Sequence, residues 1–213
     1  MSETYAYNYL SRQEMLAFVP DSALKILEVG CGDGSFAVQL TTRKDSEIWG
    51  VEKHEYSAEI ASGRLHKVIS GDFESIIGSQ LPVKYFDCII FNDVLEHFHY
   101  PERVLIRIKE LLVPHGFVVA SIPNFRYVGN LLEILIKKDF QYKSSGILDY
   151  THFRFFTQKS INRMFAESGY ELKISKGING TNSLKVKLFN IIILNYFSDI
   201  KFMQIGIQAQ LTE

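Results

Sequence analysis

The stretch ILEVGCGDGSF, residues 26–36, places three glycines at alternate positions directly after a short apolar run. An apolar run that ends in such a turn is typical of the first strand and first turn of an open α/β sheet. There the glycines let the backbone come close to a ligand at the carboxyl end of the strand. This feature constrains the chain most, because it predicts both a fold and the edge at which a ligand binds.

Short β-branched runs alternate with segments of helical spacing through the first 122 residues. This alternation predicts a parallel sheet covered by helices. Helices are expected to begin near Gly34, Tyr56 and Pro101, and the third is expected to end within VPHG, residues 113–116. The strands are expected at residues 25–29, 47–52, 67–70, 86–92 and 116–122.

The regular alternation stops after residue 122. Residues 123–156 are expected to form an insertion that carries one short helix over residues 128–138. The pattern then resumes with a helix closed by Gly169 and a strand from Tyr170. The remaining expected elements are a helix with one apolar face over residues 185–197 and a strand near a sheet edge from Met203.

The length of 213 residues and the continuous pattern indicate one domain. The formal net charge of -1 gives no overall field that would recruit nucleic acid or an anionic membrane. Cys31 and Cys88 are far apart in apolar segments, which is typical of reduced thiols. Residues 1–10 lack the features of a secretion signal, and the apolar run 188–197 is too short to span a bilayer. We therefore expect a cytoplasmic protein without a nucleic acid or membrane partner.

The glycine turn discriminates between ligand classes. A phosphate-binding loop needs a lysine after its last glycine, and Gly34 is followed by serine instead. The dinucleotide pattern G-x-G-x-x-G is weakened, because Ser35 occupies the position of its third glycine. Glu28 before the turn and Asp33 inside it favour a cationic ligand without phosphate, and S-adenosylmethionine meets that description.

ILEVGCGDGSF resembles the first motif of the class I S-adenosylmethionine-dependent methyltransferases. The resemblance implies a doubly wound, mostly parallel α/β sheet of seven strands, with helices on both faces and the last strand antiparallel. It makes residues 25–122 the cofactor-binding half, between an N-terminal helical segment over residues 1–24 and an acceptor-side insertion over residues 123–156. Residues 157–213 supply the C-terminal helix and strands. Cofactor contacts are expected from Glu28, Gly30, Cys31, Gly32 and Gly34.

Later stretches fit the same family in order. IWGVEKH supplies Glu52 at the end of the second strand, with Lys53 beside it, and a carboxylate there suits the two ribose hydroxyls. Taken singly, such an acid is more often a turn residue or a helix cap. The resemblance assigns the adenine amino group to Asp72, the adenine ring to Phe73 and the methionine part to Asn92 and Asp93.

A base is needed only if the methylated atom keeps its proton, as a hydroxyl does. His152 is the first candidate and His97 the second. Asp93, Glu96 and His97 also have the spacing D-x-x-E-H, which resembles a metal-ligand pattern in some methyltransferases, with His99 or His152 completing the shell. Carboxylate and histidine clusters are more often hydrogen-bonded networks, so we predict no metal.

The segment GILDYTHFRFFT, residues 146–157, resembles a signature of a subset of these enzymes that is associated with sugar and polysaccharide modification. In an extended conformation His152 and Arg154 would share one face, which places a base beside a fixed cation. The alternative is that both side chains hold the insertion onto the sheet, with the phenylalanines in the core. Arg154 is therefore a third catalytic candidate.

We predict O-methylation of a small polar acceptor that resembles a sugar. The alternatives are N- or C-methylation of a quinone precursor, an amino acid or a protein side chain, and a cofactor-binding module without catalysis. A nicotinamide-dependent oxidoreductase is disfavoured by the glycine spacing. The apolar face of residues 185–197 would cover the acceptor or form a homodimer.

Overall fold

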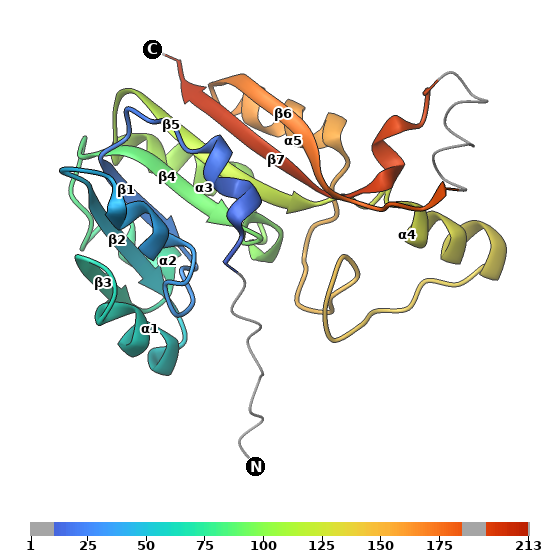
Figure 1. Ribbon diagram of the computed structural model, residues 1–213, viewed down its shortest axis with the longest axis horizontal. Helices are drawn as coiled ribbons and strands as arrows, with labels where there is room; N and C mark the ends of the chain where they lie inside the picture. The colour runs from blue at the N-terminus through green and yellow to red at the C-terminus, as the bar shows by residue number, and fades with distance from the viewer. Residues whose placement is uncertain (1–10, 185–194, 213) are drawn as a thin grey trace.

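A single twisted sheet of seven strands organises the molecule. The computed structural model describes residues 11–184 and 195–212 (Figure 1). The strand order is β3-β2-β1-β4-β5-β7-β6. Strands β1 to β5 are parallel, whereas β7 runs antiparallel to both β5 and β6. The expected doubly wound sheet with an antiparallel last strand is confirmed. The strands are β1 Lys25–Val29, β2 Glu47–Glu52, β3 Lys67–Ser70, β4 Phe86–Asn92, β5 Leu112–Pro123, β6 Tyr170–Gly180 and β7 Phe202–Leu211.

Strand β5 begins earlier than predicted, and the helix before it ends earlier. Helix α3, Pro101–Arg107, has Pro101 in its first turn as expected. It passes into a 3-10 turn and stops well before VPHG, because Leu112 already pairs with Phe86 of β4. The prediction that residues 113–116 end the helix is therefore wrong. Pairing across the sheet overrides the local turn signal there.

The other helices are short. Helix α5, Gln158–Glu167, begins with a capping box, in which the Thr157 side chain accepts a hydrogen bond from the backbone N–H of Ser160. The helix expected near Gly34 is instead a 3-10 helix, Ala37–Thr42. In the insertion, α4 continues as a π-helical turn that ends at Lys137. The expected helix at residues 185–197 lies mostly outside the described residues. The remaining α-helices are α1 Glu55–Ser62, α2 Phe73–Ile76 and α4 Val128–Leu132.

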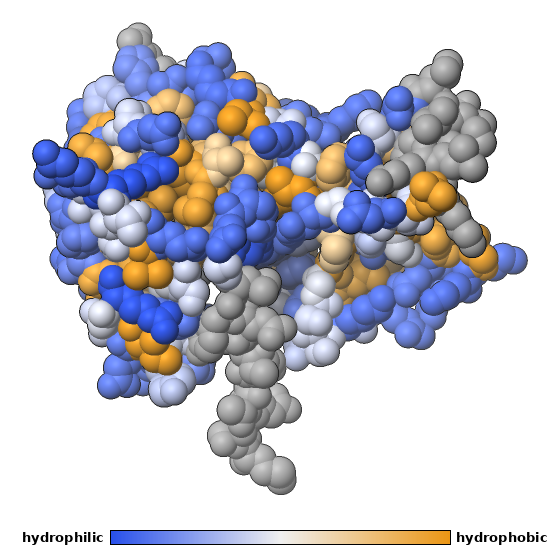
Figure 2. Space-filling view, viewed as in Figure 1, coloured by the Kyte–Doolittle hydropathy of each residue, from blue (hydrophilic) through white to orange (hydrophobic). Residues whose placement is uncertain are grey.

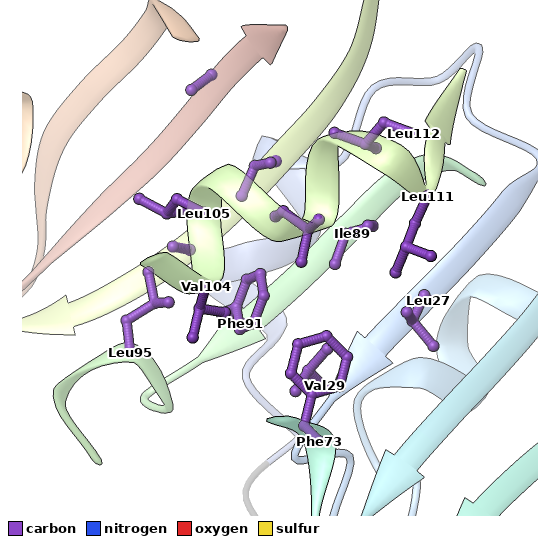
Figure 3. Close-up of a cluster of buried hydrophobic side chains, with 14 of the residues drawn as sticks. Leu27, Val29, Phe73, Ile89, Phe91, Leu95, Val104, Leu105, Leu111 and Leu112 are labelled. Carbon is purple, nitrogen blue, oxygen red and sulfur yellow. The ribbon is translucent and has the colours of Figure 1, made fainter. Parts of the chain in front are cut away.

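Two hydrophobic layers flank the sheet. On one face, side chains of α3 meet those of β4 and β1 (Figure 3). On the other face the N-terminal 3-10 helix Gln13–Phe18 packs against the strands. Phe18 is 1% exposed, and a Cβ on Gly206 of β7 would lie 2.3 Å from its ring. The N-terminal segment is thus anchored to the sheet, with Arg12 directly before the helix.

The insertion and the neighbouring ends of β6 and β7 extend from the main body, to the right of Figure 1 and Figure 2. Several large apolar side chains are exposed on the insertion. Among the described residues, no helix combines the length and the apolar character needed to cross a bilayer. The large exposed apolar residues of the insertion are Leu132, Leu135, Ile136, Phe140, Tyr142, Tyr150 and Phe153.

Candidate active site

The glycine turn lies between the parallel strands β1 and β4, at the point where the order of the strands along the sheet changes direction. Gly30, Gly32 and Gly34 have φ values of +69°, +55° and +79°, a region that favours glycine. A Cβ on Gly30 would lie 2.7 Å from a methyl group of Val94, whereas a Cβ on Gly32 would meet nothing within 4 Å. The first glycine is required by packing, and the second faces open space at the carboxyl edge of the sheet.

Glu52 fixes this turn from the end of β2. Its carboxylate accepts the backbone N–H of Gly32 through Oε2 and that of His54 through Oε1, both at 2.8 Å. The side chain is 4% exposed, so this geometry is well defined. Each oxygen keeps a further lone pair, which leaves Glu52 able to accept hydrogen bonds from a ligand.

Glu28 and Asn92 form a buried pair at the ends of β1 and β4. Asn92 Nδ2 donates to Glu28 Oε1 at 2.9 Å. Burial raises the pKa of Glu28 to about 8, and the hydrogen bond from Asn92 only partly opposes this. Glu28 Oε2 and Asn92 Oδ1 have no partner in the described structure. Two unsatisfied buried acceptors fit a ligand that carries an ammonium group, as S-adenosylmethionine does.

Two residues of the turn have structural contacts. Asp33 accepts from Arg64 at 2.6 Å and from the backbone N–H of Ser35 at 3.0 Å. These contacts outweigh its burial and hold its pKa below the usual range. Cys31 Sγ lies against β2, where a Cβ on Gly50 would be 2.6 Å away. Cys31 thus supports the turn through packing, and burial raises the pKa of its thiol.

The expected adenine contacts have local roles as well. Asp72 caps α2 by accepting the backbone N–H of Glu74 at 3.1 Å. Lys53 Nζ lies 3.6 Å from Asp72 Oδ2, and both side chains are exposed. Phe73 is 5% exposed and packs against Phe91 with ring centroids 6.0 Å apart. Phe73 is therefore a core residue rather than an open face for a ring, whereas Asp72 remains accessible.

Asp93 is the centre of a polar network that sequence reasoning did not anticipate. It has a left-handed φ of +54°. Its carboxylate accepts from Arg12, from Gln204 at 2.6 Å and from Ser121 at 3.0 Å. Arg12 also donates to Ser121 at 2.8 Å and to Glu14 at 2.9 Å. These partners come from distant parts of the chain, and no spacing in the sequence predicts that they meet.

A cavity of about 600 Å³ opens beside this network. It lies between the N-terminal segment, the ends of β4, β5, β6 and β7, and the insertion. Asp93, which is predicted to contact the methyl donor at the carboxyl edge of the sheet, and His152 of the insertion both line this cavity. Its further lining residues are Ser11, Arg12, Glu14, Glu96, Pro123, Ser145, Gly146, Ile147, Asn179, Met203 and Gln204.

His152 and Glu96 lie side by side in the wall of this cavity. Their side chains are 7% and 1% exposed, and His152 Nε2 is 3.9 Å from Glu96 Oε1. His152 Nδ1 lies 3.1 Å from the backbone oxygen of Ile147, which favours a proton on Nδ1 and a free Nε2. Neither oxygen of Glu96 has a hydrogen-bond partner in the described structure.

The two other catalytic candidates lie outside the cavity lining. The His97 ring lies 4.7 Å from that of His152, centroid to centroid, and its Nδ1 faces the backbone oxygen of Thr151. Burial, followed by the neighbouring His152, lowers the pKa of His97. Arg154 donates to the backbone oxygen of His99 at 2.8 Å. The prediction that His152 and Arg154 share one functional face is therefore wrong, because the segment is not an extended strand.

The three residues of the D-x-x-E-H pattern do not come together as one set of metal ligands, because the Asp93 carboxylate accepts hydrogen bonds from Arg12, Gln204 and Ser121 instead. Within the described ranges, ligand-type atoms of Glu96, His97 and His152 lie within 4.8 Å of one another. The absence of a metal requirement stays a prediction.

The strand order and the glycine turn at the point of reversal define a Rossmann-like methyltransferase fold. The family model described as "Methyltransferase domain" matches residues 3–173. The chain belongs to this family, and it is an S-adenosylmethionine-dependent methyltransferase.

Curated relatives share this family. A mitochondrial ubiquinone biosynthesis O-methyltransferase of Schizosaccharomyces pombe is 31% identical over 121 residues, which are 54% of this chain and 43% of that protein. A ubiquinone biosynthesis O-methyltransferase of Pseudomonas aeruginosa is 27% identical and covers 83% of this chain and 78% of its own length. The chain therefore matches less than half of the fission yeast protein but most of the bacterial one.

Solved structures share the fold. A Thermotoga maritima protein described as a SAM-dependent methyltransferase, possible histamine N-methyltransferase, has a TM-score of 0.65 at 20% identity, over 96% of this chain and 90% of its own. A SAM-dependent methyltransferase of Archaeoglobus fulgidus has the same TM-score at 19% identity, over 92% of this chain and 90% of its own.

Proposed function

We propose that the chain methylates a hydroxyl oxygen of a small phenolic acceptor of the quinone-precursor class, with His152 as the base. The observation that carries this proposal is the cavity of about 600 Å³, which is lined both by His152 and by Asp93, a residue predicted to contact the methyl donor. A free Nε2 is the group that a hydroxyl acceptor needs. The names of the curated relatives support oxygen as the methylated atom and favour a quinone precursor over the sugar-like acceptor that residues 146–157 predict.

The donor site in this proposal consists of Glu28, the glycine turn, Glu52 and Asn92. S-adenosylmethionine, when bound, supplies a methyl group activated by its positive sulfur. Glu52 would accept hydrogen bonds from the ribose hydroxyls, and the unsatisfied oxygens of Glu28 and Asn92 would face the ammonium end. His152 Nε2 takes the hydroxyl proton as the acceptor oxygen attacks. The work of the protein is to aim that oxygen and to remove its proton.

A panel of acceptors tests the proposal. Purified protein is incubated with S-adenosylmethionine and catechol, 3,4-dihydroxybenzoate, methyl glucoside or histamine, and products are identified by a mass increase of one methyl group. We expect methylated phenol, lost in His152→Ala and retained in His115→Asn. His115 is exposed at the opposite end of β5, and asparagine tolerates its φ of +60°. Transfer only to the sugar or to the amine would refute the phenolic acceptor.

The donor half has a separate test. Calorimetric titration with S-adenosylhomocysteine should show saturable binding, which Glu52→Gln weakens by about 1–3 kcal/mol because buried polar groups lose their partners. A preference for NAD would refute the donor assignment. Binding without transfer to any acceptor would favour a module without catalysis.

A further inference from the structure

Glu96 is a buried carboxyl group that the proposed chemistry leaves without a role. It is 1% exposed, and both of its oxygens lack hydrogen-bond partners in the described structure. A buried acid in this state costs free energy, since its lost hydration is not replaced. Such a group calls for an explanation, and its position in the cavity wall beside His152 provides one.

The backbone fixes the distance between Glu96 and His152. The carbonyl of Glu96 accepts the backbone N–H groups of Phe153 and Arg154, at 2.9 and 3.2 Å. Through these two hydrogen bonds, the residues that directly follow His152 attach the insertion to the turn after β4. The imidazole is held from its other side by Ile147. The separation of 3.9 Å between Nε2 and Oε1 is therefore built into the fold rather than left to two mobile side chains.

This distance is too long for a hydrogen bond and too short for a bridging water in line between the two atoms. When Nε2 takes the hydroxyl proton, a positive charge forms close to Oε1. Attraction between opposite charges at this range is strong in a site shielded from water.

We propose that Glu96 is a positioning residue that stabilises the imidazolium of His152 as it forms, so that the two side chains work as one base. This inference rests on the proposed function, in which His152 takes the hydroxyl proton. The step balances: the O–H bond of the acceptor breaks, the proton moves to Nε2, and the electron pair stays on the oxygen that forms the bond to the methyl carbon. Glu96 remains a carboxylate throughout.

Burial and, next, the charge of Asp93 raise the pKa of Glu96, so Glu96 gives up its proton at a higher pH than an exposed carboxyl group does. The active form has both groups deprotonated. Activity should therefore rise with pH, and the ascending limb of the pH–activity profile should depend on both Glu96 and His152. Other charged or titratable groups that face Glu96 and His152 are Arg12, Glu14, Asp93, His97 and Asp149.

The first test follows the imidazole by NMR in the full chain, with labelled histidine, and does not require an acceptor. The resonance absent from His152→Gln identifies His152. In Glu96→Gln we expect its titration midpoint to move to lower pH, because an amide does not hold the imidazolium proton as a carboxylate does. The exposed Glu167→Gln should leave it in place. An unchanged midpoint in folded Glu96→Gln would overturn the proposal.

The second test is kinetic and uses the acceptor that the panel identifies. Glu96→Gln should lower kcat about ten- to a hundredfold, with a small change in KM, and shift the ascending limb to lower pH. It should cause no further loss in His152→Gln, and Glu96→Asp should restore part of the rate. S-adenosylhomocysteine affinity must stay unchanged, which shows that the variant is folded. Additive losses in the double variant would overturn the inference.

A third measurement separates this role from a metal site. Methyl transfer that survives EDTA supports the pair. Transfer abolished by EDTA and restored by Mg²⁺ would assign Glu96 to a cation and overturn the inference. If no acceptor of the panel is methylated, the phenolic acceptor fails while the NMR result still decides the role of Glu96.

Discussion

The protonation of Glu28 should control how the stability of this protein depends on pH. The pKa of Glu28 is raised from 4.5 to about 8, mainly because the group is buried. A carboxyl group with a raised pKa contributes its full stability below the unfolded value of 4.5. This contribution is lost as pH rises, and the loss levels off above about 8. One pKa unit corresponds to about 1.4 kcal/mol.

These values give a specific magnitude. Between pH 5 and pH 7 the ligand-free wild type should lose about 2.5 kcal/mol of unfolding free energy through Glu28. Glu28→Gln removes the titration while its carbonyl still accepts from Asn92. The difference in unfolding free energy between variant and wild type should therefore grow by about 2.5 kcal/mol over this range, in favour of the variant. All other titrating groups are common to both proteins and cancel.

Urea unfolding followed by circular dichroism at pH 5, 6, 7 and 8 measures this difference. Asp33→Asn is the matched control. Asp33 is also buried, but its pKa is held below the usual range, so its contribution is already complete at pH 5 and constant above it. If the difference in unfolding free energy between Glu28→Gln and the wild type stays constant from pH 5 to pH 8, the reasoning is refuted.

Three further substitutions test the local structure. Gly32→Ala should lower stability by about 1–2 kcal/mol because φ is +55°, and it should weaken S-adenosylhomocysteine binding in calorimetry. Gly78→Ala, which has a normal φ, should leave that binding unchanged. Tyr170→Phe should cost about 1–3 kcal/mol in urea unfolding, because the buried hydroxyl donates to a carbonyl of α3 at 2.7 Å. Tyr56→Phe, at an exposed position, should cost little, and equal effects would contradict the argument. Thr157→Ala should cost about 1 kcal/mol by removing the cap of α5, whereas Thr157→Ser should retain it, as thermal unfolding would show.

Local patterns in the sequence were enough to predict the parallel strands and the glycine turn at their carboxyl edge. Strands β1, β2 and β4 are buried on both faces, so a short apolar run in the sequence was enough to identify each of them. The glycine turn needs left-handed backbone, a requirement that acts over a few residues and can therefore be read without a structure.

Tertiary structure decided which polar side chains meet. Arg12 and Gln204 join Asp93 although they are 81 and 111 positions away along the chain. The fold also separates His152 from Arg154, which the sequence had placed on one face, and puts Glu96 beside His152 instead. Such pairings depend on the packing of distant segments, and a residue pattern carries no information about that distance. The sequence predicted the edge of the sheet where the methyl donor should bind, but only the folded chain formed the cavity proposed for the acceptor and brought together the groups that face it.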